Sequence, residues 1–65
     1  MQLHLNGKPT KLREPLTIAG LLSELNISEQ VAVERNGGIV LRRDYAVVQL
    51  AARDRIEIVT LVGGG

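Results

Sequence analysis

The sequence predicts an α+β fold in which a mixed sheet of four to five strands carries one main helix on one face. Three observations predict it: two Asn-Gly turn signals lie between strand-forming segments, one stretch has helical apolar spacing, and a strongly β-forming segment comes near the end. The 65 residues predict a single domain over 1–65. A domain of this size buries only about 60% of its unfolded surface, so a roomy active site of its own is not expected.

The first hairpin is predicted around Asn6-Gly7, because both residue types accept the positive φ angles of a tight turn. Before it, QLHLN alternates polar and apolar residues; after it, TKLRE predicts a second strand with Leu12 facing inward. On the uncovered face of the sheet we expect the polar residues Gln2, His4, Asn6, Lys11 and Arg13.

A helix is predicted over residues 18–25. Its apolar stripe has spacing i, i+3, i+4 and i+7 and consists of Ile18, Leu21, Leu22 and Leu25. Thr17 is placed to cap its start, and Asn26 to end it. Gly20 costs about 1 kcal/mol relative to Ala, which indicates a place of close packing.

The second half of the chain predicts three further elements. VAVERNGGIVL contains two strands joined by a turn at residues 36–38, and RIEIVTLV is a strand that continues into the terminal glycines. Between them, we expect a short helical turn or loop over residues 44–48.

Alternation in the last strand points Val59 and Leu61 away from the helix if Ile56 and Ile58 face it. Two interpretations remain open at this point. A central strand is often apolar on both faces for the stability of the sheet alone, whereas apolar residues exposed together mark an interaction site. We predict a partner-docking surface of Val59, Leu61 and Val62.

Composition argues against most catalytic chemistry. The chain has no cysteine and a single histidine, His4, and it contains no phosphate-binding glycine motif. Eight basic residues are scattered among seven acidic ones with one aromatic, Tyr45, which does not favour nucleic acid. No apolar run approaches a membrane span, and no signal peptide is recognisable. We expect a cytoplasmic protein that is not an enzyme and that binds no cofactor or metal itself.

The remaining reactive group is the carboxylate of Gly65, at the end of a flexible tail formed by Gly63, Gly64 and Gly65. Such a tail is either idle, as chain ends commonly are, or slim enough to enter a narrow tunnel in a partner. Because a carboxylate is a poor electrophile, acyl chemistry on it requires a partner that uses ATP and Mg²⁺ to form an acyl-adenylate.

The chain resembles the ThiS family of sulfur carrier proteins of thiamine biosynthesis, which have a ubiquitin-like β-grasp fold. The resemblance covers nearly all of the sequence: MQLHLNG, TIAGLLSEL, VAVERNGGIVLRRDY, DRIEIVTLV and the closing glycines. It implies that an E1-like adenylyltransferase activates Gly65 with ATP and that sulfur from a cysteine desulfurase converts it to a thiocarboxylate. The thiocarboxylate would then donate sulfur to thiazole synthase.

Two departures from the family pattern stand out. The family often has a proline where this chain has Leu41 and a glycine where it has Arg53, which affects loop shape rather than tail chemistry. The alternatives are a carrier for another pathway, similar to the small subunit of molybdopterin synthase, a ubiquitin-like protein modifier, and a plain interaction module.

Overall fold

The computed structural model describes residues 1–28 and 30–61 of the chain. In chain order, its elements are β1 (Gln2–Leu5), β2 (Lys8–Lys11), α1 (Ile18–Glu24), β3 (Val31–Arg35), β4 (Gly38–Val40), the 3-10 helix η1 (Arg42–Asp44) and β5 (Arg55–Thr60).

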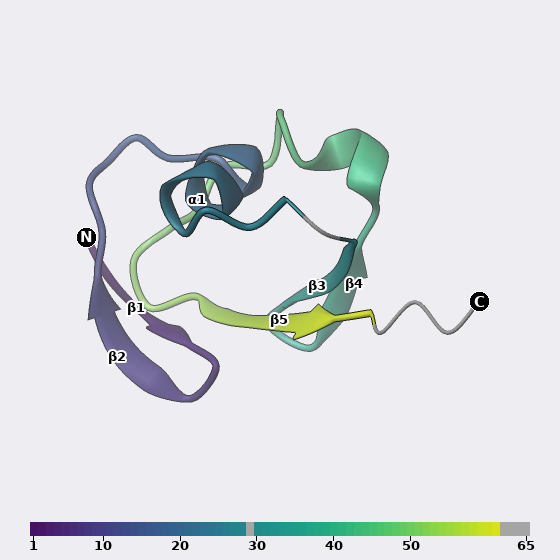
Figure 1. Cartoon of the computed structure of the whole chain (residues 1–65). Helices are drawn as coiled ribbons and strands as arrows, with labels where there is room; N and C mark the ends of the chain where they lie inside the picture. The colour runs from purple at the N-terminus through teal and green to yellow at the C-terminus, as the bar shows by residue number, and fades with distance from the viewer. Residues whose placement is uncertain (29, 62–65) are drawn as a thin grey trace.

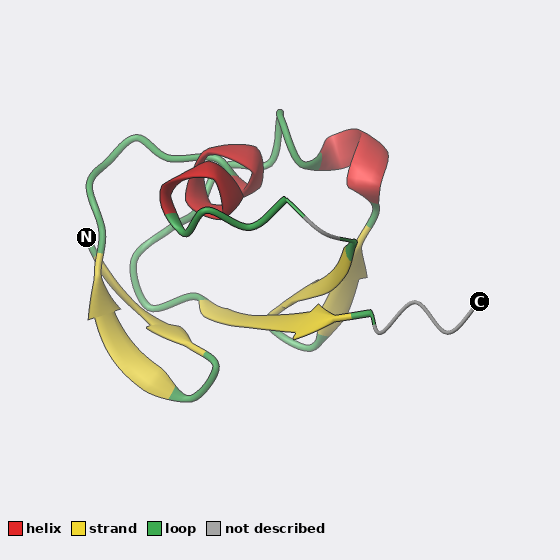
Figure 2. Cartoon of the chain, viewed as in Figure 1, coloured by secondary structure: helices red, strands yellow, loops and turns green. Residues whose placement is uncertain are grey.

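The five strands form one mixed sheet in the order β2-β1-β5-β3-β4. The last strand, β5, lies at the centre, parallel to β1 and antiparallel to β3. Both helices lie on the same side of this sheet (Figures 1 and 2), and its other face has no helix over it among the described residues. The predicted fold class is therefore confirmed.

Two-residue turns set the register of both hairpins. Asn6 and Gly7 have φ angles of 51° and 82°, and Asn36 and Gly37 have 54° and 87°, as a tight hairpin turn with two positive φ angles requires. The first turn pairs Lys8 directly with Leu5, so β2 starts at Lys8. The predicted strand TKLRE, residues 10–14, was therefore placed two residues too far along the chain.

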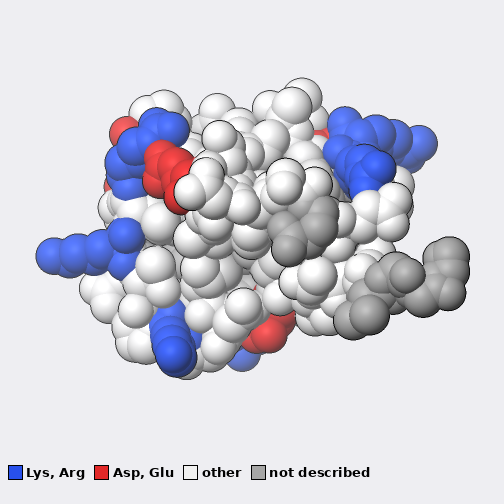
Figure 3. Space-filling model, in the orientation of Figure 1, with Lys and Arg blue, Asp and Glu red and all other residues white. Residues whose placement is uncertain are grey.

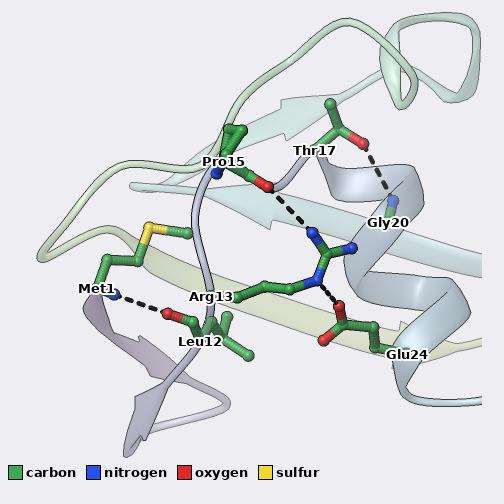
Figure 4. A network of polar contacts seen from close by, with 7 residues as sticks. All are labelled: Met1, Leu12, Arg13, Pro15, Thr17, Gly20 and Glu24. Carbon is green, nitrogen blue, oxygen red and sulfur yellow. Dashed lines mark hydrogen bonds and ion pairs between the residues drawn. The ribbon is translucent and has the colours of Figure 1, made fainter.

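Arg13 does not lie on the uncovered sheet face, contrary to our expectation. The chain leaves the sheet after Lys11, and the Arg13 guanidinium donates hydrogen bonds to the Glu24 carboxylate on α1 and, at 3.3 Å, to the Pro15 carbonyl (Figure 4). Arg13 thus joins the connection after β2 to the helix. The other polar residues expected on that face, Gln2, His4, Asn6 and Lys11, are exposed.

Thr17 caps α1 as predicted: its Oγ1 accepts a hydrogen bond from the Gly20 N–H at 3.1 Å (Figure 4). The helix ends at Glu24, one residue before the predicted end, and Asn26 then adopts a positive φ of 57°. A Cβ on Gly20 would lie 2.8 Å from the Leu16 Cδ1, closer than van der Waals contact. Close packing therefore explains the glycine.

The core lies between the sheet and the helical layer. Its buried apolar residues are Leu3, Leu16, Ile18, Leu21, Val31, Val33, Leu50 and Ile56. Of the predicted helical stripe, Ile18 and Leu21 are buried, whereas Leu25 is exposed. Burial of these side chains is the main favourable contribution to folding.

The segment between β4 and β5 packs against the start of α1. The sequence predicts a short helical turn or loop over residues 44–48. The 3-10 helix η1 lies just before this range, at Arg42–Asp44, and residues 45–48 form the turn and loop that follow it. The chain then runs back along the start of α1, where the Leu50 N–H donates to the Leu16 carbonyl at 2.8 Å and Thr17 pairs with Gln49.

The surface seen in Figure 3 carries Lys and Arg side chains in separate groups, without one continuous basic stripe. This distribution agrees with the scattered basic residues of the sequence. No helix among the described residues is both long and apolar enough to cross a membrane.

Candidate functional site

Side chains on the two faces of β5 differ in how deeply they are buried. Ile56 is fully buried and Ile58 partly buried under the helical layer, whereas Glu57, Val59 and Leu61 alternate with them on the uncovered side. Val59 is 58% and Leu61 49% exposed. The structure therefore places these two predicted docking residues at the surface together.

Neighbouring strands extend this surface. Val59 pairs with Ala32 on β3, Glu57 pairs with Glu34, and Glu34 also pairs with Ile39 on β4. Because directly paired residues point to the same side of a sheet, these five share one surface, which together with Leu61 we call the open face. Ile39 is 65% exposed.

Sequence reasoning missed Ile39 as part of this surface. The signal was present in the NGG turn, because a two-residue turn at Asn36-Gly37 fixes which strand residues pair and hence which side chains share a face. Leu41, just beyond β4, is also exposed.

The tail itself lies outside the described residues. Val62, Gly63, Gly64 and Gly65, which complete the predicted docking and modification sites, are therefore known here from the sequence alone. The last described residue, Leu61, donates its N–H to the Gln30 carbonyl at 3.0 Å, which holds the end of β5 beside the start of β3.

A buried aspartate fixes the other end of β5. The Asp54 carboxylate, 6% exposed, accepts hydrogen bonds from the Arg35 Nε at 2.8 Å, the Asn36 Nδ2 at 3.0 Å and the Ala51 N–H at 2.8 Å. Burial on its own would raise the pKa of Asp54, but these hydrogen bonds and the Arg35 charge outweigh it and hold the pKa below its ordinary value.

Asn36 completes this link, because its Oδ1 accepts a hydrogen bond from the Arg55 N–H at 2.8 Å. On the other side of β5, the Asn6 Oδ1 accepts one from the Ile58 N–H at 2.8 Å. The two turn asparagines thus position the strand that leads into the tail. Sequence reasoning identified the two asparagines only as turn residues and did not single out Asp54.

Within residues 1–28 and 30–61, no three His, Cys, Asp or Glu side chains gather in a way that could hold a metal ion. The exposed His4 pairs across the sheet with Arg55. The described residues thus offer exposed apolar side chains on and beside the strand that leads toward the tail.

Comparison with known proteins agrees with this arrangement. The ThiS family model matches residues 3–65. This chain belongs to the ThiS family. A sulfur carrier protein ThiS from Bacillus subtilis is 43% identical over 97% of this chain and 98% of its own length. The crystal structure of a thiamine biosynthesis protein (ThiS) from Geobacter metallireducens superposes with a TM-score of 0.86 at 33% identity, with both chains fully covered.

Membership of the ThiS family and the match to the Geobacter structure confirm the β-grasp fold. The chain is also 46% identical to part of a thiazole synthase from Magnetococcus marinus. This chain spans 20% of the length of that relative.

Proposed function

We propose that this ThiS protein carries sulfur as a thiocarboxylate on Gly65 and delivers it to a thiazole synthase in the cytoplasm. The observation that carries the proposal is the position of the exposed Val59 and Leu61 on the strand that continues into the glycine tail. A partner that docks on the open face thereby receives the tail at a fixed point. The thiazole synthase relative, which contains a region similar to this chain, supports a thiazole synthase as the acceptor.

The chemistry would begin on an E1-like adenylating enzyme that supplies ATP and Mg²⁺. A Gly65 carboxylate oxygen attacks the α-phosphate of ATP, and pyrophosphate leaves, so that the carbonyl carbon becomes electrophilic. The terminal sulfur of a desulfurase persulfide then attacks that carbon and displaces AMP. This chain has no cysteine, so a thiol from a partner must attack the desulfurase cysteine sulfur of the resulting acyl disulfide. A disulfide between that thiol and the desulfurase cysteine forms, and the thiocarboxylate is released.

The chain's own contribution is binding and positioning. Docking on the open face converts the encounter of the tail with a distant active site into an intramolecular event. The glycines carry no Cβ, which permits a close approach of the partner backbone to the tail.

The proposal is tested by measuring AMP formation by the purified adenylating enzyme of the same organism, with and without a sulfur source. We expect AMP release to depend on the full chain and to be lost when Gly65 is deleted, while the shortened chain still competes with the full chain for the enzyme. Adenylation that is unchanged without Gly65 would contradict the proposal.

A further inference from the structure

Most acidic side chains in the described part of the chain contact a cationic group. Six of the seven carboxylates lie there, since Glu29 falls outside it. Four of the six form ion pairs: Glu14 with the Met1 ammonium, Glu24 with Arg13, Asp44 with Arg43 and Asp54 with Arg35. Among the described residues, Glu34 and Glu57 have no such partner.

These two carboxylates are directly opposite each other. Glu34 on β3 pairs with Glu57 on β5 in the antiparallel register, and both are exposed on the open face. Like charges at directly opposed positions destabilise a sheet. No ion pair in the described part of the chain offsets this repulsion, so the arrangement has no apparent benefit for folding.

The residues around Glu34 and Glu57 suit contact with a protein partner. Glu34, Glu57 and Val59 line one shallow hollow with Gly37 and Arg55. The exposed Ile39 lies next to Glu34 across the β3 and β4 pairing. Among the described residues, the only cation that lines this hollow, Arg55, forms no ion pair with either carboxylate. Two carboxylates with the exposed apolar side chains of Val59 and Ile39 beside them favour a side chain with a planar cationic end and an apolar stem, which describes arginine.

We infer that Glu34 and Glu57 together bind an arginine side chain that the adenylating enzyme presents when it docks on the open face. This inference rests on the proposed function. A guanidinium can donate to two carboxylates at once, which fixes orientation as well as adding attraction. A divalent cation fits less well, because Ca²⁺ takes six to eight oxygen ligands and no third metal-ligating side chain joins the pair within the described ranges.

The test uses Glu34→Gln, Glu57→Gln and the double variant in the adenylation assay. Glu24→Gln is the matched control, because it removes the same charge from a helix residue that is paired with Arg13 away from the open face. For the double variant we expect KM for the carrier to rise about tenfold with kcat unchanged, as expected for loss of uniform binding. The KM of the wild-type chain should increase with salt more steeply than that of the double variant.

Folding gives an independent readout. Removing the repulsion should leave the thermal unfolding midpoint of the double variant equal to or above that of the wild type, so that a raised KM is not the result of unfolding. A KM equal to that of the wild type in the double variant would overturn the inference while leaving the proposed function intact.

Two further results would also be decisive. If the enzyme adenylates a control carrier but not the wild-type chain, both the proposed function and this inference fail. Saturable binding of Mg²⁺ or Ca²⁺ alone, measured by calorimetry and abolished in the double variant, would assign the pair to a cation and overturn the arginine site.

Discussion

The Asp54 carboxylate accepts a hydrogen bond from the Arg35 guanidinium at 2.8 Å and thereby joins the start of β5 to the end of β3. Asp54 is almost fully buried, and the Arg35 side chain is 32% exposed. The same carboxylate accepts from Asn36 and from the backbone of Ala51. One side chain therefore connects the β3-β4 turn, the preceding loop and the strand that leads into the tail.

Asp54→Asn should lower the free energy of unfolding by about 2 kcal/mol, because it weakens hydrogen bonds to a buried charged group and leaves Arg35 without its counter-ion. Urea unfolding at neutral pH measures this loss. Asp44→Asn is the control, since Asp44 is partly exposed and lies 4.0 Å from the exposed Arg43. Equal stabilities of the two variants would contradict the assigned role of Asp54.

The pKa of Asp54 also predicts a pH dependence. Because this pKa is lower in the folded state than its ordinary value of 3.8, the unfolded chain binds the proton more readily. The contribution of Asp54 to stability is therefore complete above about pH 4 and is lost as the pH falls through the folded-state pKa. Urea unfolding over this acidic range should show the wild type and Asp54→Asn converging in stability as the pH falls. A constant difference would contradict the prediction.

Arg53 has a φ angle of 72°, a conformation that glycine adopts without a Cβ penalty. This explains the glycine that the ThiS family often has at this position. Arg53→Gly should raise the free energy of unfolding by about 0.5 to 1 kcal/mol, because relief of strain exceeds the added entropy of the unfolded chain. The control Arg43→Gly, in η1, should be destabilising. Chemical denaturation compares them, and a destabilised Arg53→Gly would refute the strain.

The apolar residues of the open face should control docking rather than folding. Val59→Ser and Leu61→Ser should each raise KM for the carrier about three- to tenfold in adenylation, because each removes apolar surface from the contact. Val47→Ser is the matched control: Val47 is 71% exposed but lies in the turn after η1. Similar KM values for all three variants would show that the open face is not the docking surface.

The sequence predicted those features that depend on local chemistry. The Asn-Gly pairs gave both hairpin turns, Thr17 gave the helix start, and alternation along β5 gave the exposure of Val59. Each of these follows from the backbone preferences of one or two residues or from a simple period.

Features that depend on contacts between distant segments were missed. The Asp54 network links Asp54 to Asn36 and Arg35, which lie 18 and 19 positions earlier in the chain. The pairing of Glu34 with Glu57 depends on the register of β3 and β5, two strands that are not consecutive in the chain. Arg13 was wrongly expected on the uncovered sheet face because β2 ends before it. The turn before β2 sets the register of that strand, and the Arg13 side chain contacts Glu24 on the helix. Such contacts leave no periodic signal in the sequence.

The most direct test of the account is intact-mass measurement with fragmentation of the C-terminus. The chain is incubated with its adenylating enzyme, ATP and a sulfur source. The account predicts that one oxygen is replaced by sulfur, localised to Gly65 and trapped by a thiol-selective alkylating reagent. Localisation is necessary because oxidation of Met1 changes the mass by nearly the same amount. An unmodified Gly65, under conditions in which the same enzyme converts a control carrier, would contradict it.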